Sequence, residues 1–300
     1  PAGRISDLTR RFLEFSTAID RSAYTLEALE LDLSLLLRFL GDRFVAEIAL
    51  DDLRHFVIWL RQERQNDPRS LRRKVASVKA FFSYLRENGF RADDPAAALI
   101  YPALDPHVPE ILEASEELRL LAVADRPLWR ALLVVLLDAG LKRDEVLALH
   151  PADIYLDPVE PSRGYLVVRA TDQARRLRPR TLGLTQRLAK ELGSGLASDG
   201  ERIFDISVRG VNFIVETCAE RAGLRKRGTV SPQMLRDTYA WREVGRRVAV
   251  ERERQLTGAS TNDIATLRQR HDAEVCQILG LAPGESNDPI RRYRALYPEA

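Results

Sequence analysis

Apolar residues recur every three to four positions through most of the chain, which is the spacing of one face of an α-helix. In the first such segment, Leu8, Phe12 and Phe15 share a face. Gly41 and the Asp67-Pro68 pair end one segment and open another, as glycine and proline do at helix boundaries. The N-terminal part therefore predicts four helices, over Ile5 to Ile19, Tyr24 to Leu40, Leu50 to Glu63 and residues 70–89.

The pattern breaks between Pro102 and Pro109, where three prolines fall within eight residues. Such a stretch is typical of a linker. We therefore expect an N-terminal helical domain over residues 1–101, a linker over 102–110 and a second domain over 111–300.

The second domain mixes helical periodicity with three short β-branched or alternating stretches. The stretches predict a small antiparallel sheet, so the fold class is mainly α with an α+β second domain. Asp144 is the expected N-cap of a short helix that ends at Leu149. The predicted strands are Asp153 to Leu156, Tyr165 to Arg169 and Arg180 to Leu184, and the other predicted helices are Ala114 to Val123, Leu128 to Ala139, Thr185 to Leu192, Ser207 to Ala222, Met234 to Glu253, Asn262 to Leu279 and Pro289 to Leu296.

Composition describes an ordinary globular chain of 300 residues, 45% hydrophobic and 30% charged, with a formal net charge of only +2. Cys218 and Cys276 form no CxxC pair, and the four histidines complete no metal-ligand spacing, so we expect no metal and no cofactor. No apolar run reaches the length of a membrane span, and no charged-then-apolar leader opens the chain. These features favour a reduced, cytoplasmic setting without a membrane partner.

Basic residues are concentrated in two places. One is the N-terminal half of the fourth helix, and the other is the turn between the second and third predicted strands. Each set is consistent with a solvated face or with contacts to a phosphate backbone. The candidate DNA-binding residues are Arg69, Arg72, Arg73, Lys74 and Lys79 on the helix, and Arg176 and Arg178 on the turn.

The stretch from Ser231 to Val244 begins like a helix, with Ser231-Pro232 at its start. Arg236 is expected in the first turn, where exposed backbone N–H groups favour an anion. The alternative is a surface ion pair of Arg236 with Asp237 or Glu243.

The order of motifs resembles the tyrosine recombinases of the phage integrase family. Residues 70–99 are similar to the end of that family's core-binding, SAM-like domain, and residues 136–154 (LLDAGLKRDEVLALHPADI) resemble its first arginine box. PQMLRDTYA (232–240), ILGL (278–281) and a terminal tyrosine follow in the family's order. The resemblance implies a four-helix core-binding domain followed by a recombinase-type catalytic domain.

In that family, a tyrosine attacks a DNA phosphodiester while two arginines hold the charge that develops on the phosphate, and a lysine protonates the leaving oxygen. The resemblance places Arg236 at the second arginine and Tyr293 at the nucleophile, with Tyr297 as a rival. The remaining catalytic positions differ from the family pattern. Lys142, beside Arg143, stands at the position of the first arginine, and Arg175 stands at the position of the lysine. The three positions for proton transfer or phosphate positioning hold Gln233, Asp237 and Leu281.

The segment between PQMLRDTYA (232–240) and ILGL (278–281) is longer than the family's usual helix-turn-helix. It predicts a helical insertion over about 245–270 whose alternating charges are typical of a solvated hairpin. We interpret His271, at its end, as a surface histidine rather than a replacement for a missing catalytic one.

Three functions follow from the resemblance and the departures from it. The first is a protein that binds double-stranded DNA, acts in recombination or integration, and cleaves DNA weakly or not at all, with a homo-oligomer on DNA as an option. The second is an active recombinase that forms a 3′-phosphotyrosine through Tyr293. The third is an interaction scaffold that retains the fold without binding DNA.

Overall fold

The structure is a computed structural model that describes residues 3–104, 108–160, 163–169, 179–193, 201–224, 230–281 and 288–297. It separates into two compact units, Pro1–Pro106 and His107–Ala300. The described residues are mainly helical, with one small sheet, so the predicted fold class is confirmed. No described helix is both long enough and apolar enough to cross a membrane.

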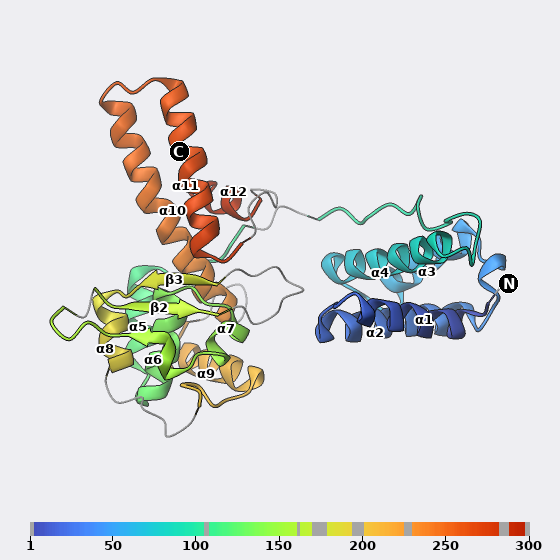
Figure 1. Ribbon diagram of the computed structural model, residues 1–300, viewed down its shortest axis with the longest axis horizontal. Helices are drawn as coiled ribbons and strands as arrows, with labels where there is room; N and C mark the ends of the chain where they lie inside the picture. The colour runs from blue at the N-terminus through green and yellow to red at the C-terminus, as the bar shows by residue number, and fades with distance from the viewer. Residues whose placement is uncertain are drawn as a thin grey trace. The chain divides into compact units, whose positions relative to one another are not determined.

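The N-terminal unit consists of four helices around one apolar core (Figure 1). Ser22 caps the second helix by accepting from the Thr25 N–H, and Asp67 caps the fourth in the same way. Phe12, Phe56 and Phe81 are almost completely buried at its centre. The helices are α1 (Ile5–Ala18), α2 (Ala23–Leu40), α3 (Leu50–Gln62) and α4 (Pro68–Glu87), with a 3-10 turn, η1 (Val45–Glu47), that the sequence pattern did not predict.

The first part of the C-terminal unit packs helices around α6, which is buried continuously from Ala131 to its end at Asp138. This burial follows from a sequence that is apolar on all sides of the helix. The unit begins with α5 (Ala114–Ala122), α6 (Pro127–Asp138), α7 (Arg143–Leu147) and η2 (Pro151–Asp153), and α8 (Gln186–Gly193) and α9 (Val208–Arg221) come later in the chain.

Among the described residues, the sheet has three antiparallel strands, as predicted, and their order is β1-β2-β3. They are β1 (Ile154–Tyr155), β2 (Tyr165–Val168) and β3 (Arg180–Gly183). Leu166 pairs with Leu182 in register, and both side chains are buried in the core of the unit. The period of two along these strands therefore directs alternate residues inward.

The last part of the unit contains three helices: α10 (Pro232–Leu256), α11 (Thr261–Ile278) and α12 (Asp288–Arg294). At 25 residues, α10 is roughly 38 Å long, and α11 runs back along it as a hairpin that extends beyond the rest of the unit (Figure 1). Val244, Val248 and Val275 form a separate apolar cluster here with Ile290 and Tyr293 from α12. The hairpin and α12 thus share a core of their own.

One predicted cap is wrong. The N-cap of α7 is Lys142 rather than Asp144, and Asp144 is the second residue of the helix. The carboxylate of Glu145 accepts the Lys142 backbone N–H at 2.8 Å, so an acidic side chain at the third helical position satisfies this terminus.

Candidate functional site

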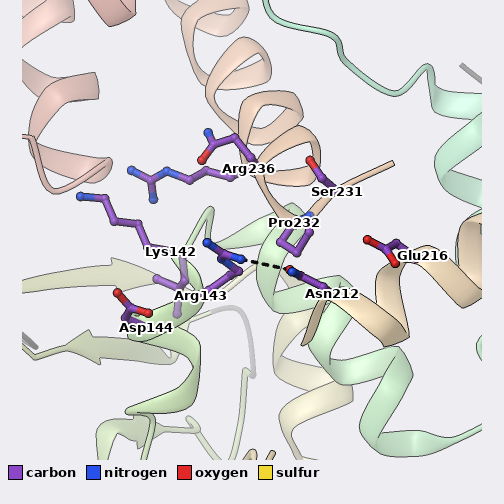
Figure 2. Close-up of a pocket in the computed structure, with 10 residues that line it drawn as sticks. Lys142, Arg143, Asp144, Asn212, Glu216, Ser231, Pro232 and Arg236 are labelled. Atoms are coloured by element: carbon purple, nitrogen blue, oxygen red, sulfur yellow. Dashed lines mark hydrogen bonds between the residues drawn. The ribbon is translucent and has the colours of Figure 1, made fainter. Parts of the chain in front are cut away.

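A cavity of about 360 Å³ lies where α10 begins, between the start of α7 and one face of α9 (Figure 2). Ser231 caps α10 by accepting from the Met234 N–H at 3.2 Å, and Pro232 occupies the first turn, as the sequence predicts. The polar residues that line the cavity are Lys142, Arg143, Asp144, Asn212, Glu216, Ser231, Gln233 and Arg236.

Two of the predicted site cations, Lys142 and Arg236, line this cavity. Their side chains extend toward the same side of it in Figure 2. Arg143, the neighbour of Lys142, is exposed and donates to the Asn212 side-chain oxygen at 3.2 Å. The structure therefore brings one lysine and one arginine of the motif set together.

Arg236 lies in the second turn of α10, not the first, and its side chain is buried rather than part of a surface ion pair. Its guanidinium donates to the Leu279 carbonyl at 2.6 Å and to the Gly140 carbonyl. The nearest carboxylate oxygen, of Glu145, is 3.9 Å away. Burial lowers the pKa of Arg236, while the Glu145 charge opposes this shift. Arg236 thus joins the turns after α6 and α11.

The Glu145–Arg180 pair supports this arginine and was not singled out from the sequence. Arg180 donates to both Glu145 oxygens, at 2.7 and 2.9 Å, and both side chains are almost fully buried. Burial alone would raise the pKa of Glu145, but the hydrogen bonds and charge of Arg180 hold it below its ordinary value. Arg180, at the start of β3, is therefore an internal ion-pair partner rather than a surface cation.

Two glycines with positive φ bring these groups close together. Gly140 has φ +57°, and a Cβ atom there would overlap the ring of Tyr239. Gly280 has φ +62°, and a Cβ there would overlap the guanidinium of Arg180. Both positions need a residue that tolerates left-handed backbone and lacks a side chain.

Tyr293 is not among the residues that line the cavity. Its side chain is 2% exposed, and its hydroxyl donates to Asp237 Oδ1. Arg292 donates to the Tyr293 hydroxyl at 2.9 Å and lies 3.4 Å from the same Asp237 oxygen. Burial and the neighbouring carboxylate raise the pKa of the Tyr293 phenol well above its usual value. The phenol is therefore kept protonated and covered.

The other family-equivalent positions surround this tyrosine or lie outside the described residues. Gln233 donates to Asp237 Oδ1 at 2.9 Å, and Leu281 packs against the apolar cluster beneath Tyr293. Tyr297 donates to the Trp241 carbonyl at 2.9 Å, and burial raises its pKa to about 12. Arg175, Arg176 and Arg178 lie outside the described residues, as does the centre of the predicted linker.

The basic residues of α4 are not equivalent in the structure. Arg69 and Arg72 are exposed, while Arg73 pairs with the buried Asp32 at 2.6 Å. Lys74 is only 8% exposed, and Lys79 donates to the carbonyls of Ala97 and Leu99 at 2.7 and 2.8 Å. On α4, the exposed members of this predicted DNA-binding set are therefore its arginines, and the two lysines are buried or half-buried.

His271 is a clear correction. It is buried, with Nδ1 2.8 Å from Glu251 Oε1, and is not a surface histidine. The hairpin has an inner face as well as a solvated one, because Val248 and Glu251 are also buried. Within the described part of the chain, no group of three or more metal-ligating side chains lies close enough to hold a metal ion.

The comparisons with known proteins agree with the motif order. The family model "Phage integrase, N-terminal SAM-like domain" matches residues 11–89. Tyrosine recombinase XerC of Xanthomonas campestris pv. campestris (strain B100) is 31% identical over 232 residues, covering 73% of this chain and 70% of XerC. This chain belongs to the tyrosine recombinase family. The XerC of Xylella fastidiosa (strain M23) is 27% identical over 73% of this chain and 76% of its own length.

Solved structures of recombinases share the fold. A lambda integrase dimer bound to a COC′ core site matches with a TM-score of 0.70 at 14% identity, over 98% of this chain and 78% of that one. The recombinase XerH, bound to palindromic difH substrate, matches with a TM-score of 0.66 at 16% identity, over 97% and 81% of the two chains. At such identities the likeness is one of fold.

Proposed function

We propose that this tyrosine recombinase binds double-stranded DNA, acts in DNA recombination or integration, and cleaves the strand weakly or not at all. The observation that carries the proposal is the placement of Tyr293. Its hydroxyl is buried and donates to Asp237, while the cationic cavity is lined by Lys142 and Arg236. The proposal thus separates a phosphate-binding region from a nucleophile that is withheld from it.

Charge and exposure support DNA binding. A phosphate at the cavity would meet the Lys142 ammonium and the start of α10, where the helix dipole also favours an anion. Arg69 and Arg72 are exposed on α4, where a second stretch of DNA backbone would meet them, and Arg72 also donates to the Pro102 carbonyl at 3.2 Å. Lambda integrase has been solved as a dimer bound to a COC′ core site and as a tetramer bound to a Holliday junction, and we include a homo-oligomer on DNA in the proposal.

The chemistry of the substituted positions supports slow cleavage. Lysine replaces the first arginine and offers a point charge instead of a two-pronged donor. Asp237 places a negative charge where the family has a histidine, and Leu281 can neither donate nor accept a proton. Each lost electrostatic donor costs about a hundred- to a thousand-fold in rate, and these losses combine, although not additively.

A salt titration of binding to random duplex DNA tests the DNA-binding part. We expect the logarithm of the binding constant to fall linearly with the logarithm of salt concentration. Lys142→Gln should weaken binding and reduce the slope by about 1, because one phosphate contact is lost. Lys190→Gln, at an exposed position on α8, is the matched control and should leave the slope unchanged. Absence of binding at low salt would favour the scaffold function instead.

The second candidate is an active recombinase that forms a 3′-phosphotyrosine through Tyr293. It is favoured by proximity, because Asp237, which accepts from Tyr293, directly follows the cavity-lining Arg236. A duplex nicked just 3′ of the scissile phosphate traps the covalent adduct, because the short fragment that leaves with a free 5′-hydroxyl diffuses away and cannot attack the phosphotyrosine. An abundant adduct that disappears in Tyr293→Phe would establish this candidate and refute weak cleavage.

A further inference from the structure

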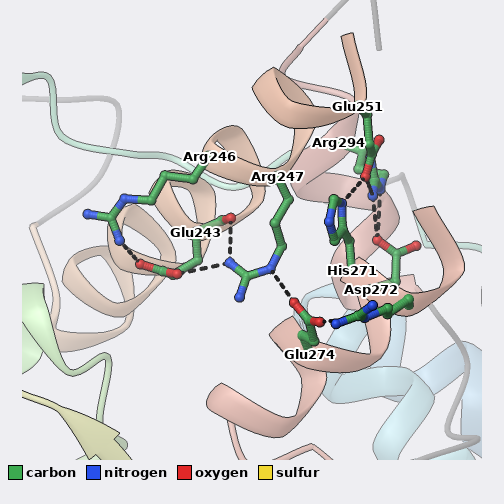
Figure 3. Close-up of polar contacts among 9 residues, drawn as sticks. Glu243, Arg246, Arg247, Glu251, His271, Asp272, Glu274 and Arg294 are labelled. Atoms are coloured by element: carbon green, nitrogen blue, oxygen red, sulfur yellow. Dashed lines mark hydrogen bonds and ion pairs between the residues drawn. The ribbon is translucent and has the colours of Figure 1, made fainter. Parts of the chain in front are cut away.

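A buried ionic cluster connects the α10–α11 hairpin to the helix that carries Tyr293 (Figure 3). Arg294, the neighbour of Tyr293, donates to both oxygens of Glu251 at 2.9 Å each and to Asp272 Oδ1 at 2.8 Å. His271 Nδ1 lies 2.8 Å from Glu251 Oε1. The Glu251 and Arg294 side chains are 4% and 12% exposed. This is a two-pronged, nearly solvent-free contact between helices that are far apart in sequence.

Glu251 is suited to be the fixed partner in this cluster. Burial by itself would raise its pKa, but the hydrogen bonds from Arg294 and His271 hold the pKa below its ordinary value. Arg268 adds a further cationic nitrogen 3.5 Å from Glu251 Oε2. The carboxylate is therefore charged at neutral pH and has several groups that keep it oriented.

Contacts along α12 transmit this restraint to Tyr293. Ile290 is fully buried in the core shared with the hairpin, and Tyr293 packs there as well. Beyond the helix, the Tyr297 ring stacks on Trp241 at 5.6 Å with an interplanar angle of 9°. A Cβ at Gly245 on α10 would overlap the Tyr297 hydroxyl, so this approach depends on a glycine. The helix is thus held at its C-terminal end and along its apolar face.

We infer that Glu251 is a positioning residue for Tyr293: by binding Arg294, it fixes α12 where the Tyr293 hydroxyl donates to Asp237 and is withheld from the cavity lined by Lys142 and Arg236. The hairpin is thereby a brace for the tyrosine helix. This inference rests on the proposed function, in which Tyr293 stands at the position of the strand-joining tyrosine. Its consequence is that weakening the brace exposes the phenol.

Acetylation of tyrosine phenols by N-acetylimidazole in the full chain, mapped by peptide mass spectrometry, tests the brace without DNA. Tyr24 is 69% exposed and serves as the internal standard for a reactive phenol, while Tyr239, 8% exposed on α10, reports general unfolding. In the wild-type protein, Tyr293 should be protected relative to Tyr24. Glu251→Gln should raise its labelling roughly tenfold, because hydrogen bonds between charged groups are lost. Tyr239 should stay protected.

Three further variants sharpen this result. Glu251→Asp keeps the charge and should restore most of the protection. Glu253→Gln, two residues away at an exposed position, is the matched control and should label like the wild type. Gly245→Ala displaces the end of α12 without touching the ion cluster, and alanine favours the α10 helix itself. It should also raise Tyr293 labelling, so the test remains decisive if Glu251→Gln folds poorly.

Several outcomes would overturn the inference. One is that Tyr293 of the wild-type protein is labelled as fast as Tyr24. Another is that Tyr293 labelling increases in neither Glu251→Gln nor Gly245→Ala. If the labelling of Tyr293 and of Tyr239 rose together, the variant would be generally unfolded, and the role of Glu251 would be merely structural. Failure of the proposed function is separate, since it is read from DNA binding at low salt.

Discussion

Two buried ionic clusters lie on the same helix, α10, and serve different ends of the site. The first contains Arg236 with Glu145 and Arg180, and the second contains Glu251 with Arg294. Their α10 residues are 15 positions apart, which corresponds to roughly 22 Å along the helix. The first cluster lies beside the cavity that Lys142 and Arg236 line, whereas the second joins the hairpin to the helix that carries Tyr293.

The two clusters differ in the groups that accept hydrogen bonds from their arginines. Arg236 donates to two main-chain carbonyls of the motif turns, so its position is set by the fold itself. Arg294 instead donates to carboxylates of the hairpin. The positions of Arg236 and of the α12 helix therefore depend on separate interactions, which can be disrupted one at a time.

The largest expected effect is at the first cluster. Glu145→Gln leaves the buried Arg180 without its charged partner, and breaking a buried pair in this way costs about 3–5 kcal/mol of unfolding free energy. Urea unfolding measures the loss. Glu220→Gln, at an exposed position on α9, is the control and should change stability by less than about 0.5 kcal/mol. A similar small change in Glu145→Gln would mean that the first cluster does not organise the fold.

A smaller loss is expected at the turn that receives Arg236. Gly140→Ala introduces a Cβ at a positive φ and against the Tyr239 ring, whereas Gly223→Ala, at φ +66°, meets no atom within 4 Å. Gly223→Ala should cost about 1–2 kcal/mol for backbone strain alone. Gly140→Ala should cost a further 1–3 kcal/mol or so for overpacking, measured by the same unfolding titration. Equal losses in the two variants would show that this turn has room for a side chain.

The smallest effect is the pH dependence of the second cluster. The pKa of Glu251 is lowered on folding, so the stability it contributes is present above its unfolded value of about 4.5 and is lost as pH falls through the lower folded value. We expect Glu251→Gln to be less stable at pH 7 but to lose less stability on acidification. Melting temperatures between about pH 6 and pH 3 measure this difference. Acid curves of wild type and variant that run parallel would contradict it.

The sequence predicted the helices and the sheet well because their signals are local. The all-round apolar run of α6 and the Ser231-Pro232 start of α10 each lie within a few consecutive residues. The predicted cap of α7 was wrong because two acidic residues, Asp144 and Glu145, are adjacent at the start of this helix. Only the direction of their side chains decides which one accepts the Lys142 N–H.

The candidate site was predictable in its members but not in its contacts. The motif order identified Arg236, Asp237 and Tyr293, yet the hydrogen bond between Tyr293 and Asp237 comes from packing of α12 on α10, and Arg236 donates instead to the turns after α6 and α11. Glu145 with Arg180 and Glu251 with Arg294 are pairs separated by 35 and 43 residues, and no local pattern encodes such partners. The alternating charges of the 245–270 segment predicted a solvated hairpin. Such a pattern does not show which charged or polar side chains will be buried against a partner, as His271 is against Glu251.

The central claim is that this recombinase binds DNA while its tyrosine is withheld. A pool of nicked duplexes with random sequence around the nick tests it in one measurement, with the bound and covalent fractions read from the same samples. The account predicts binding that weakens steeply with salt, and at most a trace of covalent adduct that is absent in Tyr293→Phe. An adduct as abundant as the bound complex would contradict the account.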